Sequence, residues 1–188
     1  MNSEPRDLVA WLRELQQETD VQREIMSLQF DIEGAIDSAQ IELAWCSLQD
    51  MIVSSLELYL RRAGIQPIAT GDQPERSGLL LQHLRRISRA NAATAQELLE
   101  KPAPTEVPDL LTQIEMVRLF LHGELGIELA ASRESATRSW ADSVLSLRRT
   151  AGEIGLAQGD GWYLSSADSA DHIGWYDEVM EALSTADN

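Results

Sequence analysis

Apolar residues recur every three or four positions along most of the chain, a spacing typical of amphipathic helices. The pattern is longest within residues 20–63, where a second apolar stripe opens beside the first. The first stripe holds Val21, Ile25, Leu28, Ile32, Ala35, Ala39, Leu43, Cys46, Val53, Leu56 and Leu60, and the second holds Ile41, Trp45, Leu48, Ile52 and Tyr59. We therefore predict one long central helix that is covered on two sides. It can kink or divide at Gly34, because glycine weakens a helix interior by about 1 kcal/mol.

Helix-breaking and capping residues divide the rest of the chain. Ser3, Pro5 and Asp7 favour a helix start, and a short helix is expected to about Gln17. Glycines and prolines in residues 64–74 predict a loop, and the sequence PAPTEVP in residues 102–108 predicts a proline-rich connector. The segments between and after these breaks predict a helix from after Pro74 to about Lys101, one over residues 108–131 and one over about 135–154, the last capped by Ser132 or Ser135.

These elements predict an all-α fold without competing strand patterns. Short connections between long helices favour antiparallel neighbours, so we expect an up-and-down antiparallel bundle of four to five long helices. We treat residues 1–188 as a single domain, since one core typically serves about 100–200 residues. Within it, residues 1–18 form an N-terminal helix, residues 20–156 the bundle, and residues 157–188 an acidic, aromatic C-terminal arm with a short helix.

The charge of the chain narrows the classes of partner. Thirty-one acidic residues against fifteen basic ones give a net charge of −16, which repels phosphate backbones and anionic lipid. Nucleic acid is therefore a disfavoured partner, and a basic protein or a small ligand is the expected kind. No apolar run approaches the roughly 20 residues that cross a bilayer. With no secretory signal recognisable at the start either, we expect a cytoplasmic protein without a membrane partner.

Motifs for metal or cofactor chemistry are not found. The three histidines fall on separate predicted elements, and neither Glu-x-x-His nor a glycine-rich phosphate loop occurs. We therefore expect no metal and no cofactor. The single cysteine, Cys46, lies on an apolar stripe, which favours a small core residue over a nucleophile.

Two polar clusters are candidate binding sites. Arg118 and His122 share a helical face with Glu115, so they form either an anion site or a solvated ladder of side chains. Arg85, Arg86 and Arg89 make a local basic patch in an acidic protein. A contact with another helix or another subunit is the first explanation for such a patch.

The stretch CSLQDMIVSSLELYLRRAGIQP, residues 46–67, and the later LLLQHLRRI, residues 79–87, resemble the HEPN superfamily of helical bundles. The same residues are similar to the helical substrate-binding domain that accompanies some nucleotidyltransferases. Ribonucleases of the HEPN superfamily carry Arg-x4–6-His, and Arg76 with His83 fits that spacing. The resemblance implies that a guanidinium and an imidazole could converge on one phosphate, in a site that generally forms across a dimer.

Four of the aromatic residues gather in one short acidic segment. It repeats Gly-Trp-Tyr, with Trp162 and Tyr163 in the first copy, Trp175 and Tyr176 in the second, and His172 between them. Such rings bury a large area at low entropic cost in cores and interfaces alike. The segment is therefore expected either to fold over the protein's own bundle, or to bind a partner or ligand.

The sequence favours a non-catalytic binding or accessory protein that acts through protein or small-ligand contacts. We expect a homodimer, because the two apolar stripes of the central helix exceed the surface that the neighbouring helices supply to cover them. The alternative is an enzyme, either a HEPN-like ribonuclease that uses Arg76 and His83 or a metal-independent enzyme with a pocket under the C-terminal arm.

Overall fold

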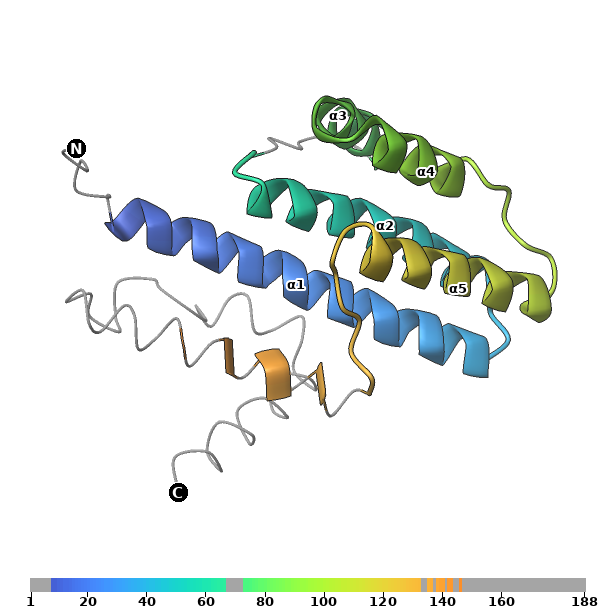
Figure 1. The fold of residues 1–188 in the computed structure, drawn as a ribbon. Helices are drawn as coiled ribbons and strands as arrows, with labels where there is room; N and C mark the ends of the chain where they lie inside the picture. Colours follow the sequence, from blue (N-terminus) through green and yellow to red (C-terminus); the bar gives the residue numbers. More distant parts are fainter. Residues whose placement is uncertain are drawn as a thin grey trace, which may run out of the picture. The chain divides into compact units, whose positions relative to one another are not determined.

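The computed structural model describes residues 8–66, 73–132, 135–136, 138–140, 142–143 and 146. The elements are α1 (Leu8–Asp37), α2 (Ile41–Arg62), α3 (Gln73–Ile87), α4 (Arg89–Leu99) and α5 (Val107–Gly123), as Figure 1 shows. Since the described residues form helices and connections and contain no strand, the predicted all-α class is confirmed for this part of the chain.

The chain divides into two compact units. One unit is Val21–Leu129, and the other combines Met1–Asp20 with Ala130–Asn188. The larger unit, which we call the helical unit, holds α2 to α5 and the part of α1 from Val21 onward. The sites described below lie within the helical unit.

The predicted boundaries of the first two helices are wrong. Helix α1 is continuous, so it joins the helix predicted to end near residue 17 to the first part of the long helix predicted over residues 20–63. That long helix breaks at residues 38–40, and not at Gly34. The break has a local cause, because Ala39 adopts φ 56° and the amide of Gln40 donates to the carbonyl of Ala35 at 2.8 Å. This left-handed residue and the backward hydrogen bond form a helix-ending motif that usually contains glycine. Here alanine takes the left-handed position.

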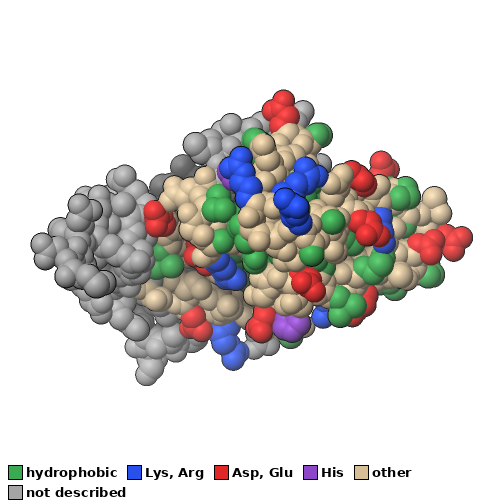
Figure 2. All heavy atoms as spheres, turned by 45° about the horizontal axis from the view of Figure 1, so that its top comes forward, with side chains coloured by type: hydrophobic (Ala, Val, Ile, Leu, Met, Phe, Trp, Pro, Cys, Tyr) green, Lys and Arg blue, Asp and Glu red, His purple; other side chains and the backbone are tan. Residues whose placement is uncertain are grey.

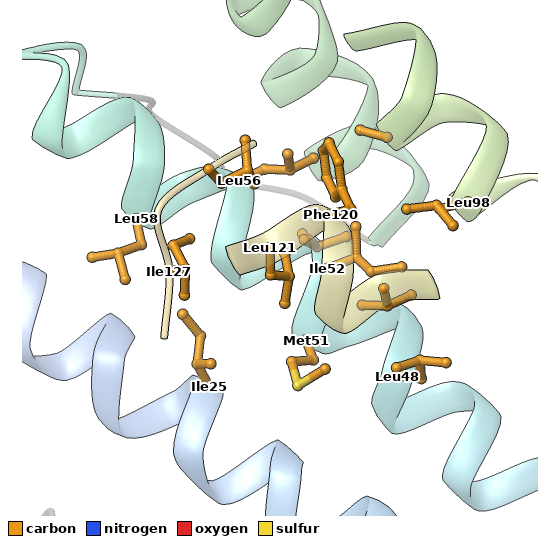
Figure 3. Packing of buried hydrophobic residues seen from close by; sticks show 14 of the residues in the cluster. Ile25, Leu48, Met51, Ile52, Leu56, Leu58, Leu98, Phe120, Leu121 and Ile127 are labelled. Carbon is orange, nitrogen blue, oxygen red and sulfur yellow. The ribbon is translucent and has the colours of Figure 1, made fainter. Parts of the chain in front are cut away.

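The core of the helical unit surrounds α2. Most residues of α2 from Ala44 to Leu60 are buried, and the helix packs against α3, α4 and α5. Figure 3 shows side chains of Ile25, Met51, Leu56, Phe120 and Leu121 meeting in this core. From Leu48 onward both apolar stripes of the helix are thus covered within one chain, with Tyr59 half-buried. The uncovered stripe from which we expected a homodimer is not present over this stretch.

The helix predicted from after Pro74 to about Lys101 is two helices, α3 and α4, that meet at Ser88. This residue adopts an extended conformation, with φ −143° and ψ 110°. Its Oγ accepts a hydrogen bond from the amide of Asn91 at 3.2 Å, so Ser88 is the N-cap of α4. The apolar spacing continues across the junction, which is why periodicity alone indicates one helix.

Helix α5 also ends earlier than predicted, at Gly123 instead of near residue 131. Gly126 has φ 63°, a conformation that favours glycine. The chain then turns so that Leu125 and Ile127 return to the core, where the amide of Ile127 donates to the carbonyl of Leu121 at 2.8 Å. The side-chain amide of Asn91 donates to the carbonyl of Glu124 at 3.3 Å, which ties the end of α5 to the start of α4.

Ser132 caps the helical segment that follows in the second unit. The amide of Ser135 donates to Ser132 Oγ at 3.1 Å, and the amide of Ser132 donates to Ser135 Oγ at 3.0 Å. These reciprocal bonds resemble a capping box. Ala136 and Trp140 are buried, as the apolar spacing of this segment predicts.

The prediction that Cys46 belongs to the core is wrong, because this residue is exposed. It lies in the second turn of α2, where Ala44, Trp45 and Leu48 face the interior. Cys46 therefore points away from that buried face, and Leu43 one turn earlier is also 51 % exposed. The first apolar stripe becomes buried only further along α2.

Candidate functional site

Polar side chains of α2 form a network with α1 and α3 inside the helical unit. Asp50, Ser54, Glu57 and Arg61 follow one another at steps of four, three and four residues, so they lie on one face of α2. Their partners on the neighbouring helices are Glu24 of α1 and Arg76 of α3. We call these six residues the ion-pair network.

Glu57 is the centre of the ion-pair network and is nearly buried, with 6 % of its surface exposed. Its Oε1 accepts from Arg61 Nη2 at 2.7 Å and from Arg61 Nε at 2.9 Å. Its Oε2 accepts from Arg76 Nη2 at 2.7 Å. One carboxylate thus joins two guanidinium groups, which is the pairing that a buried charge needs.

The remaining members of the network bring α1 into contact with α2. Ser54 Oγ donates to Glu24 Oε1 at 2.8 Å, and Arg76 Nη1 lies 3.7 Å from the same oxygen.

Burial and the charge of Glu24 raise the pKa of Asp50, which the charge of Arg76 partly offsets. Burial lowers the pKa of Arg76, but the hydrogen bond to Glu57 and the nearby carboxylates of Glu24, Glu57 and Asp50 raise it more.

This arrangement suits a structural junction better than catalysis. The guanidinium of Arg76 is bound to one carboxylate and close to a second, so binding a phosphate there would require that it leave both. His83, the other residue of the Arg76–His83 spacing, is half-buried on α3. Across the described residues, no three His, Cys, Asp or Glu side chains gather in a group that could hold a metal ion.

A second candidate site lies on the outer face of α3 and the start of α4. Arg85, Arg86 and Arg89 are all exposed, and so are Leu79 and Ile87, at 40 % and 42 %. We call these five residues the arginine surface. Arg85 Nη2 donates to Gln96 Oε1 at 2.5 Å, whereas Arg86 and Arg89 make no ion pair with a described residue. Figure 2 shows the basic side chains gathered on the face formed by these helices.

The candidate residues of α5 are all exposed. Arg118 Nη1 lies 3.8 Å from Glu115 Oε2, and both side chains are more than half exposed. This pair is part of the solvated ladder that the spacing allows, and no described contact joins His122 to it.

The aromatic candidates cannot be placed. They are Trp162, Tyr163, His172, Trp175 and Tyr176, and all of them lie outside the described residues. Their packing against the bundle or against a partner stays a prediction.

Sequence reasoning did not single out Glu24, Ser54 and Glu57. A signal for Glu57 is present, because this acidic residue stands between Leu56 and Leu58 in a helix with apolar residues on two sides. A carboxylate at such a position needs a cationic partner, and Arg61 four residues later supplies one. The second partner, Arg76, comes from another helix and is not evident from local spacing.

None of the described helices has the length and apolar character that a membrane span requires. No protein-family model matches the chain. Comparison with curated proteins and with solved structures also gave no significant match.

Proposed function

We propose that the protein is a non-catalytic binding or accessory protein that acts through protein–protein contacts made by the arginine surface. Its framework would be an antiparallel helical bundle, with the aromatic C-terminal segment as an arm. The observation that carries this proposal is the exposure of Arg85, Arg86 and Arg89 within five residues of a chain whose net charge is −16.

The composition of the arginine surface supports a protein partner. Arginine is enriched in protein interfaces because its planar guanidinium can donate two hydrogen bonds to one carboxylate and also packs against apolar groups. Exposed Leu79 and Ile87 supply the apolar part of such a contact. The partner that fits is an acidic protein surface with exposed aliphatic side chains, since carboxylates can bind the three guanidinium groups and the aliphatic side chains can pack against Leu79 and Ile87.

The ion-pair network supports the same proposal, because its charged groups already bind one another. Arg76 is bound to Glu57. A ribonuclease that uses Arg76 and His83 would need to free a guanidinium from a nearly buried carboxylate. No observation in the described part of the chain favours that alternative.

An acidic helical peptide tests the proposed function. The probe carries glutamate and leucine along one face, and fluorescence anisotropy measures its binding to the full chain. Replacing Arg85, Arg86 and Arg89 together by glutamine should weaken binding at least about tenfold, because three charge-assisted contacts are lost.

The matched control replaces three other exposed arginines, Arg62, Arg118 and Arg138, by glutamine. It changes the net charge equally and should leave peptide binding within about threefold. Equal losses in both triple variants would show that only net charge matters, and would count against the arginine surface. RNA cleavage that disappears in both Arg76→Ala and His83→Ala, with folding intact, would favour the ribonuclease instead.

A further inference from the structure

An acidic region lies at one end of the helical unit. The turn that joins α1 to α2 and the connection that joins α4 to α5 are at the same end in Figure 1. A hydrogen bond from Gln49 Nε2 to the carbonyl of Leu98, at 3.3 Å, links the first half of α2 to the end of α4. Exposed acids at this end include Glu33, Asp37, Glu42, Glu106 and Asp109.

Exposed apolar residues accompany these acids. Leu43 at the start of α2 is 51 % exposed, and Leu111 at the start of α5 is 49 % exposed. We call the five acids and these two leucines the acidic end. Lys101, the basic residue in the α4–α5 connection, is half-buried, with its ammonium 3.2 Å from the sulfur of Met116. The acidic end is therefore the chemical complement of the arginine surface, since each combines one sign of charge with two exposed aliphatic side chains.

We propose that the partner of the arginine surface is the acidic end of a second copy of this chain. This inference rests on the proposed function, because it names an occupant for the same surface. Arg85, Arg86 and Arg89 would meet carboxylates of the other copy, while Ile87 and Leu79 would meet its exposed leucines. Charged groups around an apolar centre are the usual arrangement of a specific interface.

The proposed pair would have twofold symmetry, because each copy carries both regions. Figure 2 shows basic side chains over α3 and α4 and acidic side chains toward the right-hand end of the same view. Two copies placed face to face by a twofold rotation therefore make the contact twice. A closed twofold pair is the commonest assembly of identical chains, and it stops at two copies.

Two copies that each carry a charge of −16 repel each other at long range, so local complementarity must outweigh this repulsion. Salt screens both the long-range repulsion and the local attraction between opposite charges, because the Debye length is about 8 Å at physiological ionic strength. Salt dependence alone therefore does not identify the interface, and charge exchange between the two surfaces is the sharper test.

The experiment uses two full-length variants. In the first, Arg85, Arg86 and Arg89 are replaced by glutamate, and in the second, Glu33, Asp37 and Glu42 are replaced by lysine. The wild type should sediment as a dimer in analytical ultracentrifugation. Each variant alone should be monomeric, because like charges then face each other in both contacts.

An equimolar mixture of the two variants should form a heterodimer. Each contact in the mixed pair again joins opposite charges, so association should return to within about tenfold of the wild type. Circular dichroism checks that each variant stays helical. The matched control replaces Glu115, Glu124 and Glu128 by lysine, which changes the net charge equally but lies outside the acidic end, and it should remain a dimer.

The outcomes separate this inference from the proposed function. A monomeric wild type that binds the acidic peptide would overturn the second copy as partner and leave the binding function in place. A wild-type dimer that both charge-reversal variants preserve would place the interface elsewhere and overturn the inference. Loss of dimers in each variant without recovery in the mixture would contradict it as well.

Discussion

Two adjacent serines of α2, Ser54 and Ser55, differ in what their hydroxyl groups contact. Both residues are fully buried. Ser54 Oγ donates to Glu24 Oε1 at 2.8 Å, whereas Ser55 Oγ has no hydrogen-bond partner among the described residues. They are therefore a matched pair for measuring what a buried hydroxyl contributes with and without a partner.

We predict opposite effects of alanine at these two positions. Ser54→Ala should lower the free energy of unfolding by about 1–2 kcal/mol, because it removes a hydrogen bond to a charged group. Ser55→Ala should leave it unchanged or raise it by up to about 1 kcal/mol, because the unpaired hydroxyl loses its desolvation cost. Urea denaturation followed by circular dichroism measures both values, and a clear loss of stability in Ser55→Ala would contradict the assignment.

A second prediction concerns the pair Glu57–Arg76. Glu57→Ala should cost about 3 kcal/mol of unfolding free energy, since it leaves Arg61 and Arg76 without their shared carboxylate. Arg76→Ala should cost less, because the side chain of Arg76 is 26 % exposed and Glu57 keeps its contact with Arg61. A double-mutant cycle should give a coupling above about 1 kcal/mol.

The exposed pair Glu115–Arg118 is the control for that cycle. Its atoms are 3.8 Å apart and both side chains are more than 60 % exposed, so its coupling should stay below about 0.5 kcal/mol. Couplings of equal size in the two pairs would show that burial does not strengthen the Glu57–Arg76 contact.

At the scale of elements, the junction of α3 and α4 depends on one side chain. Ser88 is the N-cap of α4, and its Oγ accepts from the amide of Asn91. We predict that Ser88→Ala lowers the free energy of unfolding by about 1 kcal/mol and that Ser88→Asp largely preserves it, because aspartate also caps helices.

The control for the cap is Thr112→Ala. The hydroxyl of Thr112 donates to the carbonyl of Pro108 at 2.9 Å on an exposed helix face and caps no helix end. Its removal should change stability by less than about 0.5 kcal/mol. A Ser88→Ala variant as stable as Thr112→Ala would argue against the cap.

Within the described residues, periodicity predicted the helical segments and most of the buried face of α2, but not where the helices end or that Leu43 and Cys46 are exposed. Trp45, Leu48 and Ile52 lie in the core because a repeat of three and four residues fixes a face. The break at Ala39 was not predictable, because a left-handed alanine resembles any other helical alanine in sequence. The break at Ser88 was missed because serine also occurs within helices and its capping role depends on backbone conformation.

One of the two candidate sites was predictable from the sequence and the other was not. The arginine surface was recognisable because its three charges are neighbours in sequence. The ion-pair network was not, because Glu24, Glu57 and Arg76 come from three helices. Only packing of these helices shows that Arg76, which the spacing with His83 marks as a catalytic candidate, is bound to an interior carboxylate.

At the scale of the whole molecule, a net charge of −16 lowers stability through repulsion among exposed acids. We predict that raising the salt concentration from about 10 mM to about 300 mM raises the urea midpoint, because the Debye length falls from about 30 Å to below 10 Å. The nearly buried Glu57 contacts are screened less and should oppose this effect only weakly.

A variant with less charge is the control for the salt effect. Replacing exposed Glu115, Glu124 and Glu128 by glutamine reduces the negative charge by three without touching the ion-pair network. The midpoint should then respond less to salt. An identical response in the variant and the wild type would mean that the salt acts through something other than net charge.

The exposure of Cys46 gives the chain one natural attachment point for a spectroscopic probe. It is the single cysteine in the sequence, and it stands one helical turn after Leu43 of the acidic end. A nitroxide spin label attached to its sulfur would sit beside the proposed contact without any engineered residue. Two labelled copies related by a twofold axis would give one narrow interspin distance in pulsed electron spin resonance, whereas separate copies would give none.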